Sequence, residues 1–305
     1  WRGKDVTAAG KRPLVFDRRR AWRAMIDEPL TLPCGQCIGC RLEYSRQWAM
    51  RCVHEAQMHE KNCFITLTLD DAHLPVEGNV PEIGWKGTLY KRELQLFMKR
   101  LRKRFGDGIR YFACGEYGDL NERPHYHAVL FNHDFEDKKP WKETRNGDVL
   151  YTSQELERLW PYGYSSLGAV TFQSAAYVAR YIMKKATGDL QSQRYEHIVA
   201  STGEVLNRSP EFVLMSRRPG IGKSWFEQYR RDVYPSDTVV FNGHAMQPPR
   251  FYDGLYEIDE PEKLADIKCE RITRARKYAH DNSVDRRRVR EKVQLQRVKL
   301  LGREV

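Results

Sequence analysis

The chain has 305 residues, 41% of them hydrophobic, and a formal net charge of +11 at pH 7. This length fits one large domain or two smaller ones, and the apolar fraction is sufficient for a hydrophobic core. The positive charge indicates a polyanionic partner or an acidic membrane surface. No apolar run approaches the length of about 18 residues that a membrane span requires, so no membrane-embedded role is expected.

The first distinctive motif is a compressed group of three cysteines, Cys34, Cys37 and Cys40, which follows a basic, aperiodic segment (1–33) expected to wrap the surface. Its spacing is too tight for a disulfide framework and is typical of thiolate metal binding in a reducing cytoplasm. A structural Zn²⁺ is favoured, with iron–sulfur ligation and free thiols as alternatives. The fourth ligand is expected from an upstream cysteine or from Cys52, His54 or His59.

Hydrophobic periodicity predicts an alternation of helices and strands along the next part of the chain. Helices are predicted at residues 42–61, 89–105, 152–160 and 174–185. Strands are predicted at residues 64–69, 109–115, 123–131 and 163–172, with residues 211–215 as a strand or a buried segment and 132–149 as a polar loop. This order indicates an α+β fold with a central, mainly antiparallel sheet flanked by helices.

The strand at 123–131 carries a His-x-His pattern. In an extended strand, His125 and His127 project from the same face, and two imidazoles can converge on one metal ion. The preceding strand ends next to Glu116, and the turn-rich segment between them predicts a hairpin that brings this carboxylate opposite the histidines. Two histidines and one carboxylate suit a divalent ion that keeps open positions for substrate. The alternative for Glu116 is a solvated turn residue.

A predicted helix carries Tyr177, Tyr181 and Lys184 on one stripe, since residues three and four apart share a helix face. A tyrosine pair at this spacing is also common in ordinary core packing. The charge of Lys184 would favour the phenolate of a nearby tyrosine, whose ordinary pKa is about 10. Tyr181 is the nearer tyrosine in sequence, which favours it for a first reaction.

The C-terminal part is expected to consist of a connector (236–262) and a basic helical tail (263–305). The run at 220–224, Gly-Ile-Gly-Lys-Ser, is similar to a phosphate-binding loop. It lacks the earlier glycine of that motif, because Arg217 stands there. Nucleotide binding at this run is therefore not expected.

Taken together, the motifs resemble those of HUH endonucleases that initiate rolling-circle replication. The strand at 64–68, the His125-Tyr-His127 strand and the Tyr177/Tyr181/Lys184 helix occur in the same order as in the Rep-type members of that superfamily. The runs 33–41, 114–118 and 215–222 further resemble the replication initiators of gokushovirus-type microviruses. The similarity extends over residues 12–235.

The resemblance implies a five-stranded, RRM-related sheet within an endonuclease domain at 34–235, into which the cysteine loop at 34–40 is inserted. It implies that His125, His127 and Glu116 bind Mg²⁺ or Mn²⁺ and that Tyr177 and Tyr181 cut and rejoin single-stranded origin DNA through a 5′-phosphotyrosine link. It also implies action in the cytoplasm of a bacterial host, together with a host helicase and polymerase.

Two other classes of function fit the same residues. One is a non-catalytic single-stranded nucleic-acid-binding protein with a structural metal, which would use the basic surface and the aromatic side chains. The other is a metal-dependent hydrolase that activates water and forms no covalent intermediate with DNA.

Overall fold

The computed structural model describes residues 17–20, 33–75, 77, 79–80, 83–118, 122–144, 147–181, 194–199 and 203–300. These residues divide into two compact units, one within 41–225 and the other formed by residues 17–20, 33–40 and 226–300. Most of the segment predicted to wrap the surface (1–33) lies outside the described residues. Among the helices described, none is long and apolar enough to cross a membrane.

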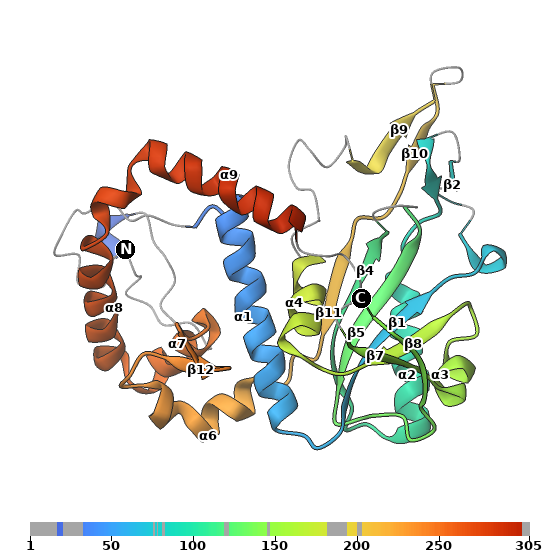
Figure 1. The fold of residues 1–305 in the computed structure, drawn as a ribbon, viewed down its shortest axis with the longest axis horizontal. Helices are drawn as coiled ribbons and strands as arrows, with labels where there is room; N and C mark the ends of the chain where they lie inside the picture. The colour runs from blue at the N-terminus through green and yellow to red at the C-terminus, as the bar shows by residue number, and fades with distance from the viewer. Residues whose placement is uncertain are drawn as a thin grey trace. The chain divides into compact units, whose positions relative to one another are not determined.

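The first unit is built on a large antiparallel sheet (Figure 1). Its strands run in the spatial order β11, β4, β5, β1, β8, β7, β6. Their bounds are β1 Asn62–Thr68, β4 Arg110–Tyr117, β5 Pro124–Phe131, β6 Lys139–Glu143, β7 Val149–Thr152, β8 Ser165–Gly168 and β11 Phe212–Met215. The helices are α1 Ile38–Gln57, α2 Lys91–Phe105, α3 Gln154–Leu159 and α4 Phe172–Tyr181, and two small hairpins pair β2 Asn79–Val80 with β3 Trp85–Lys86 and β9 Glu196–Ile198 with β10 Val205–Asn207.

The predicted α+β class and the antiparallel sheet are confirmed, but within the described residues the sheet has seven strands rather than five. The two additional strands, β6 and β7, form a hairpin inside the segment predicted as a polar loop. All five residues of β6 are exposed, so this edge strand has no alternation of apolar and polar residues. The hairpin joins the rest of the sheet through the register pair Tyr151 and Leu167. The other five strands are contiguous neighbours.

Strict alternation along the central strands gives the sheet two apolar faces. On one face, Ile65, Tyr126 and Ala113 pack in a core with side chains of α2 and α3 such as Phe97 and Leu156. On the opposite face, the core is formed by side chains of α1, α4 and the strands: Trp48, Ala49, Cys52, Phe64, Phe112, Cys114, Val129, Phe131, Ala175, Val178, Ala179 and Ile221. The sheet therefore lies between two helical layers.

The start of α4 differs from the prediction in a way that matters for the site. The helix begins at Phe172, and the capping residue is Thr171 rather than Ser174. The Thr171 hydroxyl accepts a hydrogen bond from the backbone N–H of Ser174 (3.0 Å), and the Ser174 hydroxyl accepts one from the N–H of Thr171 (2.8 Å). This reciprocal pair is a capping box. Pattern reading chose the wrong member of the pair because both residues are good caps.

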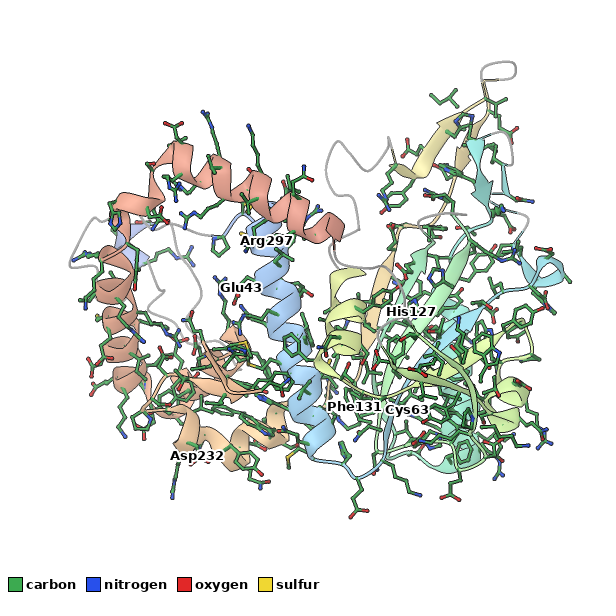
Figure 2. All side chains as sticks on the ribbon, viewed as in Figure 1. Glu43, Cys63, His127, Phe131, Asp232 and Arg297 are labelled. Atoms are coloured by element: carbon green, nitrogen blue, oxygen red, sulfur yellow. The ribbon has the colours of Figure 1, made fainter. Side chains whose placement is uncertain are left out.

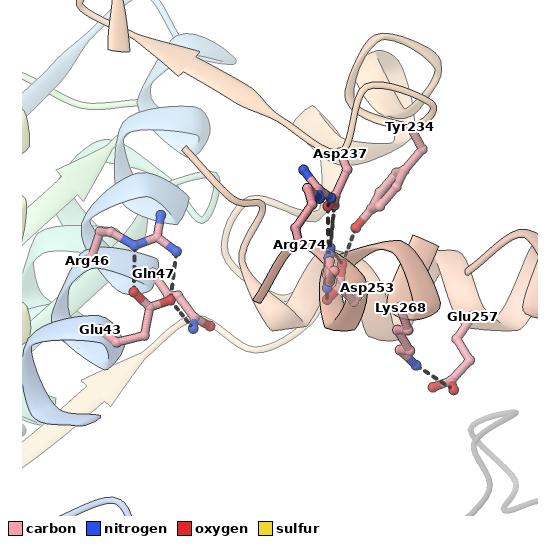
Figure 3. Close-up of polar contacts among 10 residues, drawn as sticks. Glu43, Arg46, Gln47, Tyr234, Asp237, Asp253, Glu257, Lys268 and Arg274 are labelled. Atoms are coloured by element: carbon pink, nitrogen blue, oxygen red, sulfur yellow. Dashed lines mark hydrogen bonds and ion pairs between the residues drawn. The ribbon is translucent and has the colours of Figure 1, made fainter. Parts of the chain in front are cut away.

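The second unit contains α6 Lys223–Val233, β12 Val239–Phe241, β13 His244–Met246, α7 Arg250–Asp259, α8 Pro261–Arg276 and α9 Val284–Leu300. The segment predicted as a connector (236–262) is folded here into two short strands and α7. Tyr252 and Tyr256 of α7 are buried, and Tyr256 stacks on Tyr234 with ring centroids 4.1 Å apart. Figure 3 shows the polar contacts that join Tyr234, Asp237 and Asp253 to arginines of α8.

Candidate active site

Three potential metal ligands converge on the sheet face that α4 covers. Glu116 on β4 lies directly opposite His125 on β5 in the strand register. The Glu116 Oε1 atom is 2.9 Å from His125 Nε2 and 3.0 Å from His127 Nε2. His127 lies along β5 on the same face as Phe131, four residues further on (Figure 2). The two histidines and the carboxylate are thus brought together by strand pairing. Glu116 is a buried strand residue, and the alternative of a solvated turn residue is wrong.

The outer ring nitrogens of both histidines have fixed partners. His125 Nδ1 is 3.0 Å from the carbonyl oxygen of Arg123, and His127 Nδ1 is 3.0 Å from the hydroxyl oxygen of Thr66. A carbonyl only accepts, so His125 Nδ1 carries the hydrogen, and in the neutral ring the Nε2 lone pair points at the Glu116 carboxylate. Two acceptors 2.9 Å apart require a proton or a cation between them. Carbonyl or hydroxyl partners of this kind are the usual supports of metal-binding histidines.

The geometry of the three donors fits a divalent ion. Two donors at about 2.1 Å from an octahedral ion, at right angles to each other, are separated by about 3.0 Å. The two distances from Glu116 Oε1 agree with that value, and the three ligand atoms all lie within 4.8 Å of one another. Burial raises the pKa of the Glu116 carboxyl, but the hydrogen bonds from His125 and His127 lower it by more, so that its pKa is about 2. A buried carboxylate anion is therefore present at neutral pH.

Helix α4 places a phenol beside this cluster. The Tyr177 hydroxyl donates a hydrogen bond to Glu116 Oε1 across 3.4 Å. The Tyr177 ring meets His127 edge-on, with centroids 5.0 Å apart, and also packs edge-on against Phe64 at 6.5 Å. These ring contacts fix the direction of the side chain, so the hydroxyl is aimed at the group of ligands.

The other predicted residues of this helix are not placed in the same way. Tyr181 is the last described residue of α4, and its side chain is outside the described part of the structure. Lys184 lies outside the described residues altogether.

The three clustered cysteines are close together at the start of α1. Cys34 Sγ and Cys40 Sγ are 3.8 Å apart, and the backbone N–H of Cys37 donates to Cys34 Sγ at 3.3 Å. That backbone hydrogen bond lowers the pKa of the Cys34 thiol to about 7. Two sulfurs bound to one tetrahedral Zn²⁺ at about 2.3 Å would be about 3.8 Å apart. The cluster therefore has the spacing of a thiolate metal site.

The three downstream residues suggested as a fourth ligand for the cysteines are engaged elsewhere. Cys52 is fully buried in the core beneath α1. The His54 ring is buried and stacks on Trp225 at 3.5 Å. His59 follows the far end of α1, where its Nε2 lies 3.7 Å from the Glu55 carboxylate. Within the described ranges, Cys34, Cys37 and Cys40 form a group of three.

Two contacts were not foreseen from the sequence. The first is the hydrogen bond of Thr66 to His127, which depends on the pairing of β1 with β5 and so has no local signal. The second explains the run at 220–224, where the backbone N–H of Gly222 donates to the buried carboxylate of Glu55 at 2.6 Å. A protein carboxylate thus occupies the position that a phosphate would take in a nucleotide loop.

The chain is similar to known replication proteins over this whole region. The family described as replication-associated protein ORF2 matches residues 62–186, which include the histidines, the carboxylate and α4. Replication-associated protein VP4 of Bdellovibrio phage phiMH2K is 36% identical over 241 residues, covering 76% of this chain and 69% of the relative. Replication-associated protein ORF2 of Spiroplasma virus 4 is 32% identical over 236 residues, covering 74% and 68%.

A more distant relative is replication-associated protein ORF4 of Chlamydia phage 1, which is 28% identical over 232 residues and is covered over 53% of its length. No solved structure matches the chain. The matches confirm the resemblance to replication proteins of gokushovirus-type microviruses. On the strength of the two relatives that it covers over more than two thirds of their length, the chain belongs to the family of microvirus replication-associated proteins.

Proposed function

We propose that this chain initiates rolling-circle replication by nicking and rejoining single-stranded origin DNA through metal-dependent tyrosine transesterification. The observation that carries the proposal is the position of the Tyr177 hydroxyl, 3.4 Å from the carboxylate oxygen that both histidines share. A nucleophile beside three metal ligands is the arrangement that phosphoryl transfer to a side chain requires. The replication-associated names of the relatives support the same process.

Glu116, His125 and His127 would hold the ion, with Mg²⁺ or Mn²⁺ as the candidates. The bound ion would polarise the scissile phosphate and stabilise charge on its oxygens. Three protein ligands leave positions open for phosphate oxygens. The fixed outer partners of the two imidazoles keep the ligand nitrogens pointed inward without rearrangement, which favours fast loading of substrate.

The proposed nucleophile of the first cut is Tyr177. Its oxygen attacks phosphorus, the bond from phosphorus to the 3′ oxygen breaks, and a 5′-phosphotyrosine and a free 3′-OH result. Its contact with Glu116 supports Tyr177 over Tyr181 for this step, contrary to the order that sequence proximity to Lys184 favoured. Tyr181, one helical turn later, would serve in a second cut, and Lys184 would stabilise phenolate charge.

For the cysteine cluster we propose a structural Zn²⁺ held by Cys34, Cys37 and Cys40. The sulfur separation of 3.8 Å supports this choice, and a fourth ligand from upstream of the cluster would complete the tetrahedron. Metal analysis of anaerobically purified protein is expected to give about one zinc per chain that is lost when all three cysteines are changed to serine. A zinc content unchanged by those substitutions would exclude this site.

We propose the cytoplasm of an infected bacterium as the place of action and a host helicase and polymerase as partners. The named relatives come from viruses of bacteria. In addition, the phosphate-loop-like run near Gly222 is occupied by Glu55, which supports a separate source of ATP-driven strand separation.

A labelled origin oligonucleotide analysed on a denaturing gel tests this function. The proposed enzyme gives a metal-dependent, protein-linked strand and a free 3′-OH fragment. A hydrolase gives fragments without the linked strand, and a non-catalytic binding protein gives intact DNA. Either of the last two outcomes would overturn the proposal.

A further inference from the structure

Tyr164 is the most exposed large hydrophobic side chain among the described residues, with 81% of its surface accessible. It lies immediately before β8, in the turn that follows α3. The tyrosine two positions earlier, Tyr162, behaves differently. Its ring packs edge-on against Trp160 at 5.1 Å and lies under the guanidinium of Arg100 at 5.4 Å. Single exposed aromatic side chains are ordinary, so the position of Tyr164 must decide whether its exposure has a purpose.

That position is on the same row of the sheet as the proposed metal ligands. Glu116 pairs with His125, and His125 pairs with Thr68 in the strand register. The backbone N–H of Thr68 donates to the carbonyl oxygen of Tyr164 at 2.8 Å, which extends the row by one more strand. Adjacent strands are about 4.8 Å apart, so the backbone of Tyr164 is about 10 Å from that of His125.

Alternation along β8 indicates which face the ring occupies. Ser165 pairs with Leu67, which belongs to the core on the α2 face, and Ser166 pairs with Thr66, which bonds to His127. Tyr164, one residue before Ser165, therefore shares the face of Thr66, His127 and the site. An exposed aromatic ring thus lies on the site's own face, two strands away from the ligands.

The turn that presents this ring is held in place by its backbone. The indole Nε1–H of Trp160 donates to the carbonyl oxygen of Thr68 at 2.7 Å, and the Thr68 hydroxyl accepts from the N–H of Tyr164 at 3.1 Å. Gly163 approaches the neighbouring strand so closely that a Cβ atom there would lie 2.6 Å from the carbonyl oxygen of Thr68. By contrast, the Tyr164 side chain has no hydrogen bond or ring contact with any residue that the structure describes.

We propose that Tyr164 is a stacking platform for a nucleobase of the single-stranded DNA, a few nucleotides from the scissile phosphate. This inference rests on the proposed function, since the metal site defines where the phosphate lies. Aromatic side chains on rigid backbone are the usual base-stacking elements of single-strand binding proteins, because every base has a π face. The net charge of +11 supplies the complementary attraction for the phosphates. Tyr164 acts in this account by positioning the strand and takes no part in the chemistry.

The test measures binding without cleavage. A fluorescent, mixed-sequence single strand of about 30 nucleotides, longer than the roughly 4–16 nucleotides of a typical site, is titrated with the full chain in the presence of a chelator. Tyr164→Ala is expected to weaken binding by about 5- to 150-fold, whereas Tyr164→Phe keeps the ring and stays within about twofold of the unmodified protein. Tyr278→Ala, which truncates another exposed tyrosine (65% accessible) in the second unit, is the matched control and is expected to leave binding unchanged.

A second readout reports stacking itself. With 2-aminopurine placed in turn at positions around the cleavage site, one or two positions should show fluorescence quenching that Tyr164→Ala removes and Tyr164→Phe retains. Equal binding and equal quenching in the alanine variant would overturn the platform, as would a phenylalanine variant as weak as the alanine variant.

Failure of this inference is distinguishable from failure of the proposed function. If the unmodified protein forms the covalent adduct while Tyr164→Ala binds DNA normally, only the platform is wrong. If stacking depends on Tyr164 but no adduct forms, the platform stands and the nicking mechanism is wrong. If the unmodified protein does not bind single-stranded DNA, both are wrong.

Discussion

At the scale of single residues, the orientation of the two imidazoles depends on groups that are not themselves ligands. Thr66 holds His127 Nδ1 at 3.0 Å, and this contact exists only because β1 pairs with β5. Sequence reading could identify both histidines from their alternation, but it assigned Thr66 no role. Its partner lies 61 residues away, and no local pattern specifies that pairing.

Replacing Thr66 by valine keeps the shape of the side chain and removes the hydroxyl. We expect Mn²⁺ affinity to fall by about 10- to 100-fold, because loss of such a supporting partner costs that much at other metal sites. Electron paramagnetic resonance titration of Mn²⁺ measures it. Thr68→Val is the control, since the Thr68 hydroxyl bonds to the backbone of Tyr164 rather than to a histidine. Equal affinities in the two variants would exclude the supporting role.

The lowered pKa of Cys34 predicts a pH-dependent reactivity in the metal-free protein. A thiol with a pKa of about 7 is half thiolate near neutral pH, so alkylation by iodoacetamide at Cys34 should rise through that range and level off above about pH 8. The cause is the backbone N–H of Cys37, which stabilises the thiolate. Peptide mapping by mass spectrometry measures the rate, with exposed Cys269 as the internal control.

Adding Zn²⁺ before the reagent should protect Cys34, Cys37 and Cys40 together while Cys269 still reacts. Protection of Cys34 without the other two would show that the three thiols do not share one ion.

At the scale of elements, the predictions held where burial imposed a period and failed where it did not. The strands around Phe64, Phe112 and His127 lie between two helical layers, so their alternation is visible in the sequence. Strand β6 is exposed throughout and was missed. Helix α7 was assigned to a connector because the surrounding prolines and acidic residues resemble a linker, whereas its tyrosines bury a core in the second unit.

That core depends on a partly buried ionic network. Asp253 accepts a hydrogen bond from the Tyr234 hydroxyl at 2.6 Å and pairs with Arg271 at 2.6 Å, and Asp237 also pairs with Arg271 (Figure 3). Asp253→Ala leaves the Arg271 charge and the Tyr234 hydroxyl with fewer partners. We expect it to lower the free energy of unfolding by about 3 kcal/mol, measured by urea denaturation.

The control for this prediction is Lys268→Ala, which removes a more exposed pair with Glu257 in the same unit. It should cost about 0.2–1 kcal/mol. Equal costs for the two variants would mean that the Asp253 network is no more important than a surface ion pair.

At the scale of the whole molecule, the net charge of +11 predicts DNA binding that is strongly sensitive to salt. For about six phosphate contacts on a single strand, raising the salt concentration from about 50 to 200 mM should weaken binding by roughly 10²- to 10³-fold. Fluorescence anisotropy with the chelated protein measures it. A methylphosphonate strand without backbone charge is the control and should show almost no salt dependence. A flat response with ordinary DNA would argue against phosphate-dominated binding.

The class of the molecule was accessible from sequence, because charge, motif order and strand alternation each indicated a DNA-processing α+β protein. The convergence of Glu116 with both histidines was also predicted, since a hairpin fixes the register locally. The division into two compact units was not, because residues 33–40 and 226–300 belong together only through contacts far apart in the chain.

The central claim is that a tyrosine of α4 becomes covalently joined to DNA. The most direct measurement is mass spectrometry of peptides from the protein after reaction with a single-stranded origin oligonucleotide and Mn²⁺. The account predicts a phosphonucleotide on the peptide that contains Tyr177 and Tyr181, with its loss in the double variant Tyr177→Phe, Tyr181→Phe, which should still bind DNA. An adduct that survives in the double variant, or one that maps to another peptide, would contradict it.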